Sequence, residues 1–216
     1  MLFKDYNIDM FLKELSSDAP SPGGGSTAAL VSALSGALNS MVYSLTIGKK
    51  MFESLSIENK EKMMEFNKKA NDFIKNSKEF MEKDRRDFLE LMNSYKMPKS
   101  TDEEIIIRKN KIKEYTIKAM ETPLNLAKEC LGFYDNIAFA VEYGNKNLVS
   151  DAGVAAILLH SAIESAIINV KVNLNSLRND DKFLNLEDEC NEILNNSISR
   201  KTYLLNIVGE LIYPAK

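Results

Sequence analysis

Apolar residues recur every three or four positions along most of this chain, which is the period of an amphipathic α-helix. The clearest run predicts a long helix from about Ile57 to Tyr95, with apolar or small residues at Phe66, Ala70, Phe73, Ser77, Phe80, Phe88 and Leu91. Further helices are predicted from about Asp9 to Ser17, after Ser100-Thr101, around Leu126 to Val141, after Ser150 and from about Lys182 to Ile212. Nine glycines and five prolines leave long stretches uninterrupted. The pattern predicts an all-α multihelical bundle forming a single domain, residues 1-216.

One stretch departs from the amphipathic pattern. Gly23, Gly24 and Gly25 are followed by Ser26 and then by small and aliphatic residues as far as Val42, without a face of long charged side chains. We expect this to be the central helix of the bundle, packed on all sides. A glycine loop at a helix N-terminus directs free amides and the positive dipole end at an anionic or carbonyl-bearing ligand. The structural alternative is that small residues only let helices pack closely.

A second small-residue helix is predicted after Gly144-Asn145, with Ser150 or Asp151 at its N-terminal cap. Near its other end, Asn169 and Asn173 lie one turn apart among aliphatic residues. Buried amides need partners, so these two either tie helices together or face a polar ligand. His160 is the only histidine and has aliphatic neighbours, so we expect a packed or surface-edge residue rather than a catalyst. Between these regions, Thr122-Pro123-Leu124 is expected to begin a new helix or to kink one.

Asp84 falls on the apolar stripe of the long predicted helix, between Phe80 and Phe88. A carboxylate on a core-facing seam is unfavourable unless it is paired, hydrogen-bonded or facing a cavity. It either pairs with Arg85 or Arg86 of a neighbouring chain or with a lysine, or it acts as a general acid or base in a partly desolvated cleft. Asp87, three residues on, is expected at the rim of the same face.

Composition excludes some classes of function. With 44% hydrophobic and 27% charged residues and a net charge of −3, the chain is typical of a globular protein and not of a nucleic-acid binder. We expect no membrane partner, because no apolar run of about 20 residues stands out. Cys130 and Cys190 are expected to be free thiols, which fits a cytoplasmic setting. No grouping of residues suggests a metal site, so we predict no metal.

Several of these stretches together resemble one known family. The run from Phe11-Leu12 through the three glycines to Ser26, continued by Leu45-Thr46-Ile47-Gly48-Lys49-Lys50, is similar to the opening of the cyclodeaminase domain of formiminotransferase-cyclodeaminase and of the stand-alone methenyltetrahydrofolate cyclohydrolases. Asp84 and Phe88 match the family's Asp-x-x-Ala-Phe signature, with Asp87 in place of Ala. Thr122-Pro123-Leu124, the segment 145–156, Asn169-Val170 and Asn173-Leu174 also resemble family motifs, in the same order.

The resemblance implies a helical-bundle enzyme that acts on tetrahydrofolate-bound one-carbon units as a homodimer. Its reaction would be cyclisation of 5-formiminotetrahydrofolate with release of ammonia, hydrolysis of 5,10-methenyltetrahydrofolate to 10-formyltetrahydrofolate, or both. No cofactor is expected beyond the tetrahydrofolate substrate. Asp84 would be the general acid/base; the expected substrate-binding residues are Gly23, Gly24, Gly25, Ser26, Lys49, Lys50, Asn147, Ser150, Asp151 and Asn169.

Three alternatives remain open at this point. Lys49 and Lys50, which could meet the anionic glutamate tail of a folate, could equally complement the dipole of the preceding helix. The chain could be a non-catalytic helical module in which Asp84, Asn169 and Asn173 form a structural polar core. It could also be an enzyme of the same fold acting on a different amidine or folate-like substrate.

Overall fold

The computed structural model describes residues 1–178 and 180–214, and the predicted all-α fold is confirmed over these residues. The single domain expected for residues 1-216 includes residues 179 and 215–216, which lie outside the described part. The α-helices of the described chain are α1 (Ile8–Leu15), α2 (Gly24–Ser44), α3 (Lys50–Glu53), α4 (Ile57–Tyr95), α5 (Asp102–Tyr143), α6 (Val149–Asn175) and α7 (Leu186–Ile212). Short 3-10 turns occur at Phe3–Asp5, Lys146–Leu148 and Asp181–Phe183.

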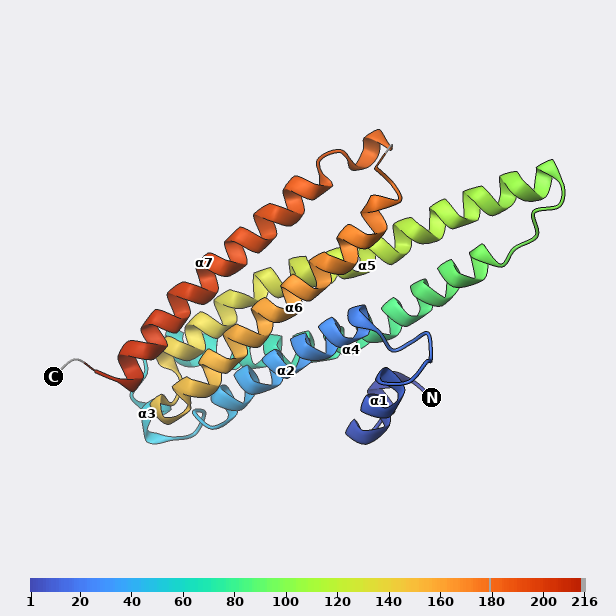
Figure 1. Ribbon diagram of the computed structural model, residues 1–216. Coiled ribbons are helices and arrows are strands. Elements are labelled where there is room, and N and C mark those ends of the chain that lie inside the picture. The colour runs from blue at the N-terminus through green and yellow to red at the C-terminus, as the bar shows by residue number, and fades with distance from the viewer. Residues whose placement is uncertain (179, 215–216) are drawn as a thin grey trace.

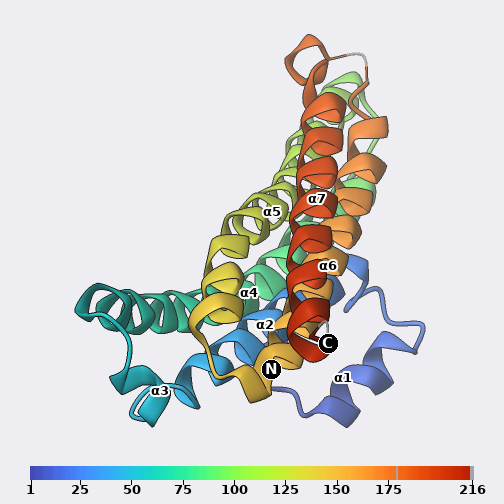
Figure 2. The same ribbon diagram turned by 90° about the vertical axis from the view of Figure 1, so that its left-hand side faces the viewer.

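The helices pack around one continuous apolar core (Figure 1). Helix α2 lies between α4 and α6, while α5 packs on both α4 and α6, and α7 covers the outer side of α6 and α5 (Figure 2). Helices α4 and α5 run on past the first residue of α2 and form a two-helix arm. The base of this arm is therefore where α2, α4, α5 and α6 come together.

Helix α2 and helix α6 are antiparallel neighbours. The beginning of α2 lies against the C-terminal half of α6, and Oγ of Ser35 donates to the carbonyl of Ala155 at 2.7 Å near the N-terminal end of α6. Small residues allow this close packing. At Gly36, for example, a Cβ atom would stand only 2.8 Å from Cδ1 of Phe73 on α4.

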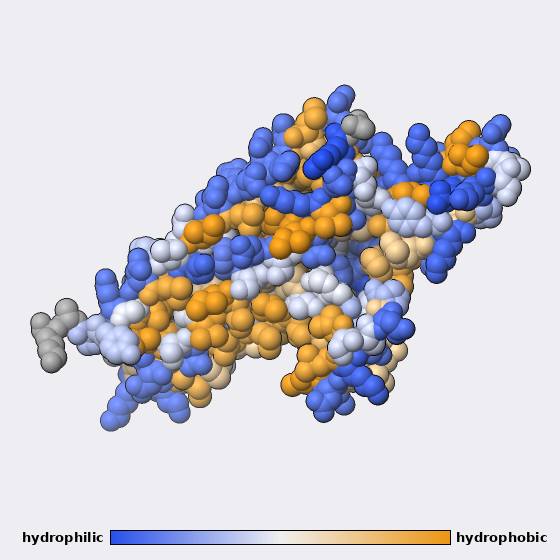
Figure 3. All heavy atoms as spheres, viewed as in Figure 1, coloured by the Kyte–Doolittle hydropathy of each residue, from blue (hydrophilic) through white to orange (hydrophobic). Residues whose placement is uncertain are grey.

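The expectation that α2 is packed on all sides is wrong. Leu34 in the middle of the helix is 49% exposed, and a matching stripe of exposed aliphatic residues runs along α6. Figure 3 shows apolar side chains gathered on the face that carries these helices. We call this the α2/α6 face; it comprises Leu30, Val31, Leu34, Leu38, Val154, Ile157, Ile168 and Val172. A sequence without long charged residues on any side is therefore compatible with an exposed apolar surface as well as with a core.

Helix α5 is continuous through Pro123, so a new helix does not begin there. Proline lacks the N–H that would bond to the carbonyl four residues earlier. The carbonyl of Ala119 instead accepts a hydrogen bond from Nδ2 of Asn173 on α6, at 3.2 Å. The missing helical bond is thus replaced from a neighbouring helix, which ties α6 to α5.

The helix limits follow local capping. The predicted limits of α4 are confirmed, and α5 begins with a capping box in which Thr101 and Glu104 bond each other's backbone amides. Helix α7 begins at Leu186 rather than near Lys182, because residues 181–183 form a separate 3-10 turn. Cys130 and Cys190 are both buried free thiols, as expected.

One segment, Lys146–Asn175, is long and apolar enough to span a membrane by length and composition alone, although we expected none. Just over half of its apolar window, 56%, is buried inside the protein. Helix α6 packs against α2, α5 and α7, so its apolar character is accounted for by its place in the core.

Candidate active site

Asp84 lies against the N-terminus of α2, where the glycine loop becomes helix. Oγ of Ser26 donates a hydrogen bond to Oδ2 of Asp84 at 2.8 Å, and Ser26 is completely buried. The Asp84 side chain itself is only partly buried. The Asp84 carboxyl therefore points inward from the apolar stripe of α4, as the sequence predicted. It lies between the solvent and the first turn of α2.

Two of the three glycines are explained by close approach. A Cβ atom on Gly25 would overlap Oδ1 of Asp84, and one on Gly24 would stand 3.3 Å from Nδ2 of Asn169. At Gly23 a Cβ would meet nothing within 4 Å. The loop thus lets a helix N-terminus approach a carboxyl from α4 and an amide from α6 more closely than any residue with a side chain would allow.

The surroundings of Asp84 act on its pKa in opposite directions. Burial raises the pKa of this carboxyl, hydrogen bonds from Ser26 lower it, and the negative charge of Asp87 raises it; the outcome is a pKa above the ordinary value. Within the described residues Asp84 has no ion-pair partner. Arg85 bonds the carbonyl of Met1 and lies over the Phe3 ring, while Arg86 lies near Asp87. The alternative of a salt-bridged Asp84 is therefore not supported within this chain.

Asp87 is not the rim residue that we expected. It is 3% exposed, and its Oδ2 accepts a hydrogen bond from Oγ1 of Thr122 on α5 at 2.6 Å. Nε of Arg86 lies 3.7 Å from its Oδ1. The sequence placed Asp87 near the seam of α4, but only the position of α5 shows that a donor meets it there. Thr122 was thus missed as a member of the site, although its place before Pro123 marked the segment as unusual.

Asn169 and Asn173 extend the site along α6. Asn169 is half-buried beside Gly24, and its Nδ2 donates to the carbonyl of Ser165 at 2.8 Å. Asn173 donates to the carbonyls of Asn169 and Ala119. Of the two roles left open by the sequence, Asn173 ties helices together, whereas Asn169 lies at the mouth of the α2 loop.

The other predicted binding residues lie at the opposite end of α2. Lys49 and Lys50 are exposed after its C-terminus, and Asn145 bonds Oγ1 of Thr46 through its backbone N–H at 2.8 Å. That bond places the N-terminal end of α6 here, with exposed Asn147, exposed Ser150 and half-buried Asp151. At a rise of about 1.5 Å per residue, the length of α2 separates this group from Asp84 by roughly 30 Å. The chain alone does not bring the two groups together.

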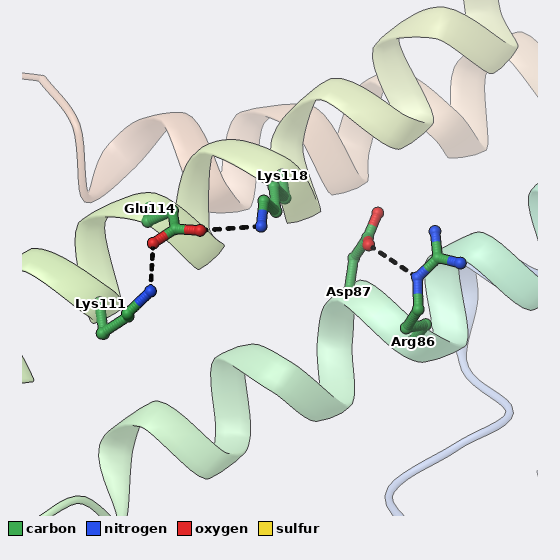
Figure 4. A network of polar contacts seen from close by, with 5 residues as sticks. All are labelled: Arg86, Asp87, Lys111, Glu114 and Lys118. Carbon is green, nitrogen blue, oxygen red and sulfur yellow. Dashed lines mark hydrogen bonds and ion pairs between the residues drawn. The ribbon is translucent and has the colours of Figure 1, made fainter.

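A groove of about 330 Å³ opens beside Asp87, between α4 and α5. Figure 4 shows Arg86 and Asp87 of α4 opposite Lys118 of α5. Both basic and acidic side chains line the groove. Nζ of Lys118 lies 2.8 Å from Oε1 of Glu114. The lining of the groove consists of Lys83, Arg86, Asp87, Glu90, Lys118, Glu121 and Thr122. A polar group bound at the base of the arm would therefore meet both signs of charge.

His160 lies outside this site and is packed, as expected. Its Nδ1 lies 2.8 Å from Oγ of Ser197, which is 3.0 Å from the hydroxyl of Tyr134. Burial lowers the pKa of the imidazole, as does the charge of Lys201, while Glu164 acts in the opposite direction. Because Ser197 is fully buried, this serine and histidine do not form an accessible nucleophile.

Comparison with known proteins identifies the family of this chain. A family model described as formiminotransferase-cyclodeaminase matches residues 7–192. The methenyltetrahydrofolate cyclohydrolase of Methylorubrum extorquens is 37% identical over 170 residues, covering 79% of this chain and 80% of that protein. The formimidoyltransferase-cyclodeaminase of Rattus norvegicus is 30% identical over 176 residues, covering 82% of this chain and 32% of that protein.

The fold also has a solved counterpart. The crystal structure of formiminotetrahydrofolate cyclodeaminase from Thermotoga maritima matches with a TM-score of 0.78 over 96% of both chains, at 22% identity. At that identity the match shows a shared fold, while the family match covers the α2 loop, Asp84, Asp87, Thr122 and Asn169. The resemblance inferred from the sequence motifs is thus confirmed, and the chain belongs to the formiminotransferase-cyclodeaminase family.

Proposed function

We propose that this protein converts tetrahydrofolate-bound one-carbon units at the methenyl level, with Asp84 as general acid and base. The observation that carries the proposal is the partly buried Asp84 carboxyl, with its raised pKa, held against the free N-terminal amides of α2. A carboxyl that can hold a proton nearer to neutral pH can both remove and return one during catalysis. The names of the relatives in the family support this class of substrate.

In cyclodeamination, N10 of 5-formiminotetrahydrofolate attacks the carbon of the protonated formimino group, an amidinium, and forms a tetrahedral centre that carries an NH2 group. Asp84 in its ionised form accepts the proton that N10 loses, and then donates it to the departing nitrogen. The carbon–nitrogen bond breaks, ammonia leaves and the 5,10-methenyl product forms. The partly desolvated position of Asp84 suits both transfers, because one group must change protonation state twice in each turnover.

In cyclohydrolysis, water adds to the methenyl carbon of the cationic substrate while Asp84 accepts a proton from that water. Asp84 donates that proton to N5 and the bond from the carbon to N5 breaks. The hydroxyl group loses its own proton to solvent as it becomes the formyl carbonyl of 10-formyltetrahydrofolate. The name of the Methylorubrum extorquens relative, a methenyltetrahydrofolate cyclohydrolase, favours this second reaction. Both reactions need the same proton carrier, so we propose one site for both and no cofactor beyond the folate.

The remaining residues of the site would orient the substrate. Free amides at Gly24 and Gly25, together with the helix dipole, suit a carbonyl oxygen of the pterin, and Asn169 beside them offers an amide. Holding the reacting atoms in register accelerates ring closure by removing their freedom to move apart. Gly23 starts the turn that brings these groups to Asp84.

We further propose that the protein is a homodimer paired through the α2/α6 face. Exposed aliphatic side chains on two adjacent helices form a larger apolar surface than isolated surface residues do. A two-fold axis through the middle of this face would place the partner α2 antiparallel, so its C-terminal end would lie near this chain's Asp84. Lys49, Lys50, Asn147, Ser150 and Asp151 would then serve the partner's site. The buried free thiols fit a cytoplasmic protein.

The function is tested by following the methenyl chromophore with purified protein and each folate in turn. Faster appearance of absorbance from 5-formiminotetrahydrofolate than in buffer identifies a cyclodeaminase. Faster loss of absorbance from 5,10-methenyltetrahydrofolate identifies a cyclohydrolase. No acceleration with either substrate would contradict the proposal and favour a different amidine substrate.

A purely structural role for Asp84 and Asn169 is tested by stability. A catalytic carboxyl held in a partly desolvated place contributes little to the stability of the folded state. Asp84→Ala should therefore lower the free energy of unfolding only slightly, or raise it. A loss of several kcal/mol in denaturant unfolding of Asp84→Ala or Asn169→Ala would instead indicate a structural polar network.

A further inference from the structure

A second carboxylate, Asp87, is buried one helical turn beyond Asp84 on α4. It is more deeply buried than Asp84, although it takes no direct part in the chemistry proposed above. Burying an ionised carboxylate is unfavourable unless donors compensate it. A buried carboxylate beside the proposed proton carrier is therefore expected to have a role of its own.

The contacts of Asp87 compensate for the burial of its carboxyl group. Thr122 donates its hydroxyl hydrogen to Oδ2 at 2.6 Å, from the residue just before Pro123. The guanidinium of the exposed Arg86 lies 3.7 Å from Oδ1. Hydrogen bonds and positive charge both favour a carboxylate over a carboxylic acid. The Thr122 bond also fixes the carboxylate, since both atoms come from long packed helices.

Asp84 and Asp87 are spaced i and i+3, which places their Cβ atoms about 5–6 Å apart on one helix face. Two carboxylates this close in a partly desolvated place disfavour each other's ionisation. No other acidic side chain in the groove lies so near Asp84 along α4, because Glu90 is nearly two turns away. The other charged groups around the pair come from three places: Lys83 and Arg86 of α4, Lys118 and Glu121 of α5, and, near the N-terminal segment, Lys4, Glu82 and Arg85. Helices α2 and α6 contribute only uncharged groups here, which are backbone amides and Asn169.

We propose that Asp87 is a positioning residue for Asp84: its negative charge, fixed by Thr122 one helical turn away, favours the protonated form of Asp84 and so lets this carboxyl return a proton as well as accept one. The consequence for catalysis rests on the proposed function of Asp84 as general acid and base. The electrostatic effect itself does not depend on the substrate. Burial of Asp84 acts in the same direction and is the larger influence on its pKa, with Asp87 adding to it.

The test compares Asp87→Asn, which keeps the shape and an acceptor for Thr122, with the wild-type protein. The titration midpoint of the Asp84 carboxyl is followed by carbon NMR of protein labelled at aspartate, with the Asp84 signal identified by its absence in Asp84→Asn. We expect Asp87→Asn to lower that midpoint, and to shift the acid limb of the kcat profile to lower pH with little change in KM.

Glu79→Gln is the matched control, because it removes one negative charge from the same helix at an exposed position outside the groove. It should leave both the NMR midpoint and the kcat profile where they are. If Asp87→Asn is poorly folded, Asp87→Ala combined with Thr122→Val removes the carboxylate and its donor together and leaves no buried group unpaired. The same downward shift is expected for that pair.

An unchanged Asp84 midpoint in Asp87→Asn or in the double variant would overturn the inference, and so would an equal shift in Glu79→Gln. Failure of the proposed function is a separate result. It would show as wild-type protein that accelerates neither folate reaction, while the NMR midpoints still decide whether Asp87 controls the proton affinity of Asp84.

Discussion

At the scale of single residues, the site depends on the absence of one side chain. Gly25 has no Cβ, and the Asp84 carboxyl occupies the space where that atom would be. Gly25→Ala must therefore push the carboxyl away from Ser26 and the α2 amides. A displacement of about 1 Å at a reacting group is enough to lower turnover by roughly 100-fold. We expect a loss of that order in kcat for folate conversion.

Gly23→Ala is the control for this substitution, because a Cβ there meets nothing within 4 Å. It should retain turnover close to wild type while adding the same methyl group to the same loop. Equal losses in the two variants would mean that loop flexibility, rather than the contact with Asp84, is what the glycines provide.

The only histidine gives a second prediction at this scale. Burial lowers the pKa of His160 in the folded protein, whereas the unfolded chain protonates near the ordinary value of about 6.5. Below that pH the unfolded state binds more protons than the folded state, so stability decreases as pH falls and is full above it. Urea unfolding across this range should show the decrease, and His160→Gln should flatten it. A stability that stays constant below the ordinary histidine pKa would contradict this.

The sequence could predict part of the residue-level picture. Asp84 was identifiable because an acidic residue interrupted an otherwise apolar stripe, and that regularity survives in the structure. Asp87 was misplaced because a single helix does not show which neighbouring helix covers it. Only the packing of Thr122 from α5 buries it.

At the scale of elements, Pro123 explains why α6 carries a half-buried Asn173. Because proline leaves the Ala119 carbonyl without its helical donor, Asn173 satisfies it from α6. Asn173→Ala should therefore lower the free energy of unfolding by about 1–3 kcal/mol, the usual cost of an unpaired buried polar group.

In a Pro123→Ala background the new backbone N–H can bond the Ala119 carbonyl, so the same Asn173→Ala change should be less destabilising. A double-mutant cycle measured by chemical denaturation gives the coupling. Full additivity of the two changes would show that Asn173 and Pro123 are unrelated.

Element limits were predictable where caps and periodicity agreed, as for α4 and the start of α5. They were not predictable at Pro123, where local sequence favours a break but α6 supplies the missing hydrogen bond. Similarly, the small-residue pattern of α2 correctly indicated close packing against α4 and α6. It did not reveal that one side of α2 faces outward, because aliphatic residues are compatible with either a core or an interface.

At the scale of the whole molecule, the two groups of predicted binding residues lie at opposite ends of α2. An antiparallel pairing of two α2/α6 faces would bring the second group of one subunit close to Asp84 of its partner. Leu34, near the middle of α2, would lie close to the two-fold axis and meet its own copy. We expect Leu34→Glu to give a monomer with a mass of 24.4 kDa by light scattering, where the wild type gives about twice that.

Ile57→Glu is the control for this change, since Ile57 is 77% exposed at the start of α4 and lies off the α2/α6 face. It should leave the dimer intact. A wild-type protein that is monomeric at all concentrations tested, or a Leu34→Glu variant that remains dimeric, would contradict pairing through this face.

If each active site is built from two subunits, a mixture of two inactive variants should regain activity. Asp84→Asn and the double variant Lys49→Ala with Lys50→Ala should each be nearly inactive, if the partner's Lys49 completes the site. Unfolding and refolding the two together would give about half heterodimers, each with one intact site of two, so activity should return to about a quarter of wild type. Absence of any recovery, with heterodimers present, would place the lysines outside the site.

The central claim is that Asp84 carries the proton in a folate reaction. The most direct test is the methenyl absorbance assay on Asp84→Asn, with circular dichroism and folate binding measured on the same sample. We predict that turnover of the active substrate falls by at least 100-fold, as expected on losing a general acid or base, while helicity and binding are retained. Turnover equal to wild type in a folded Asp84→Asn protein would show that the proton is carried elsewhere.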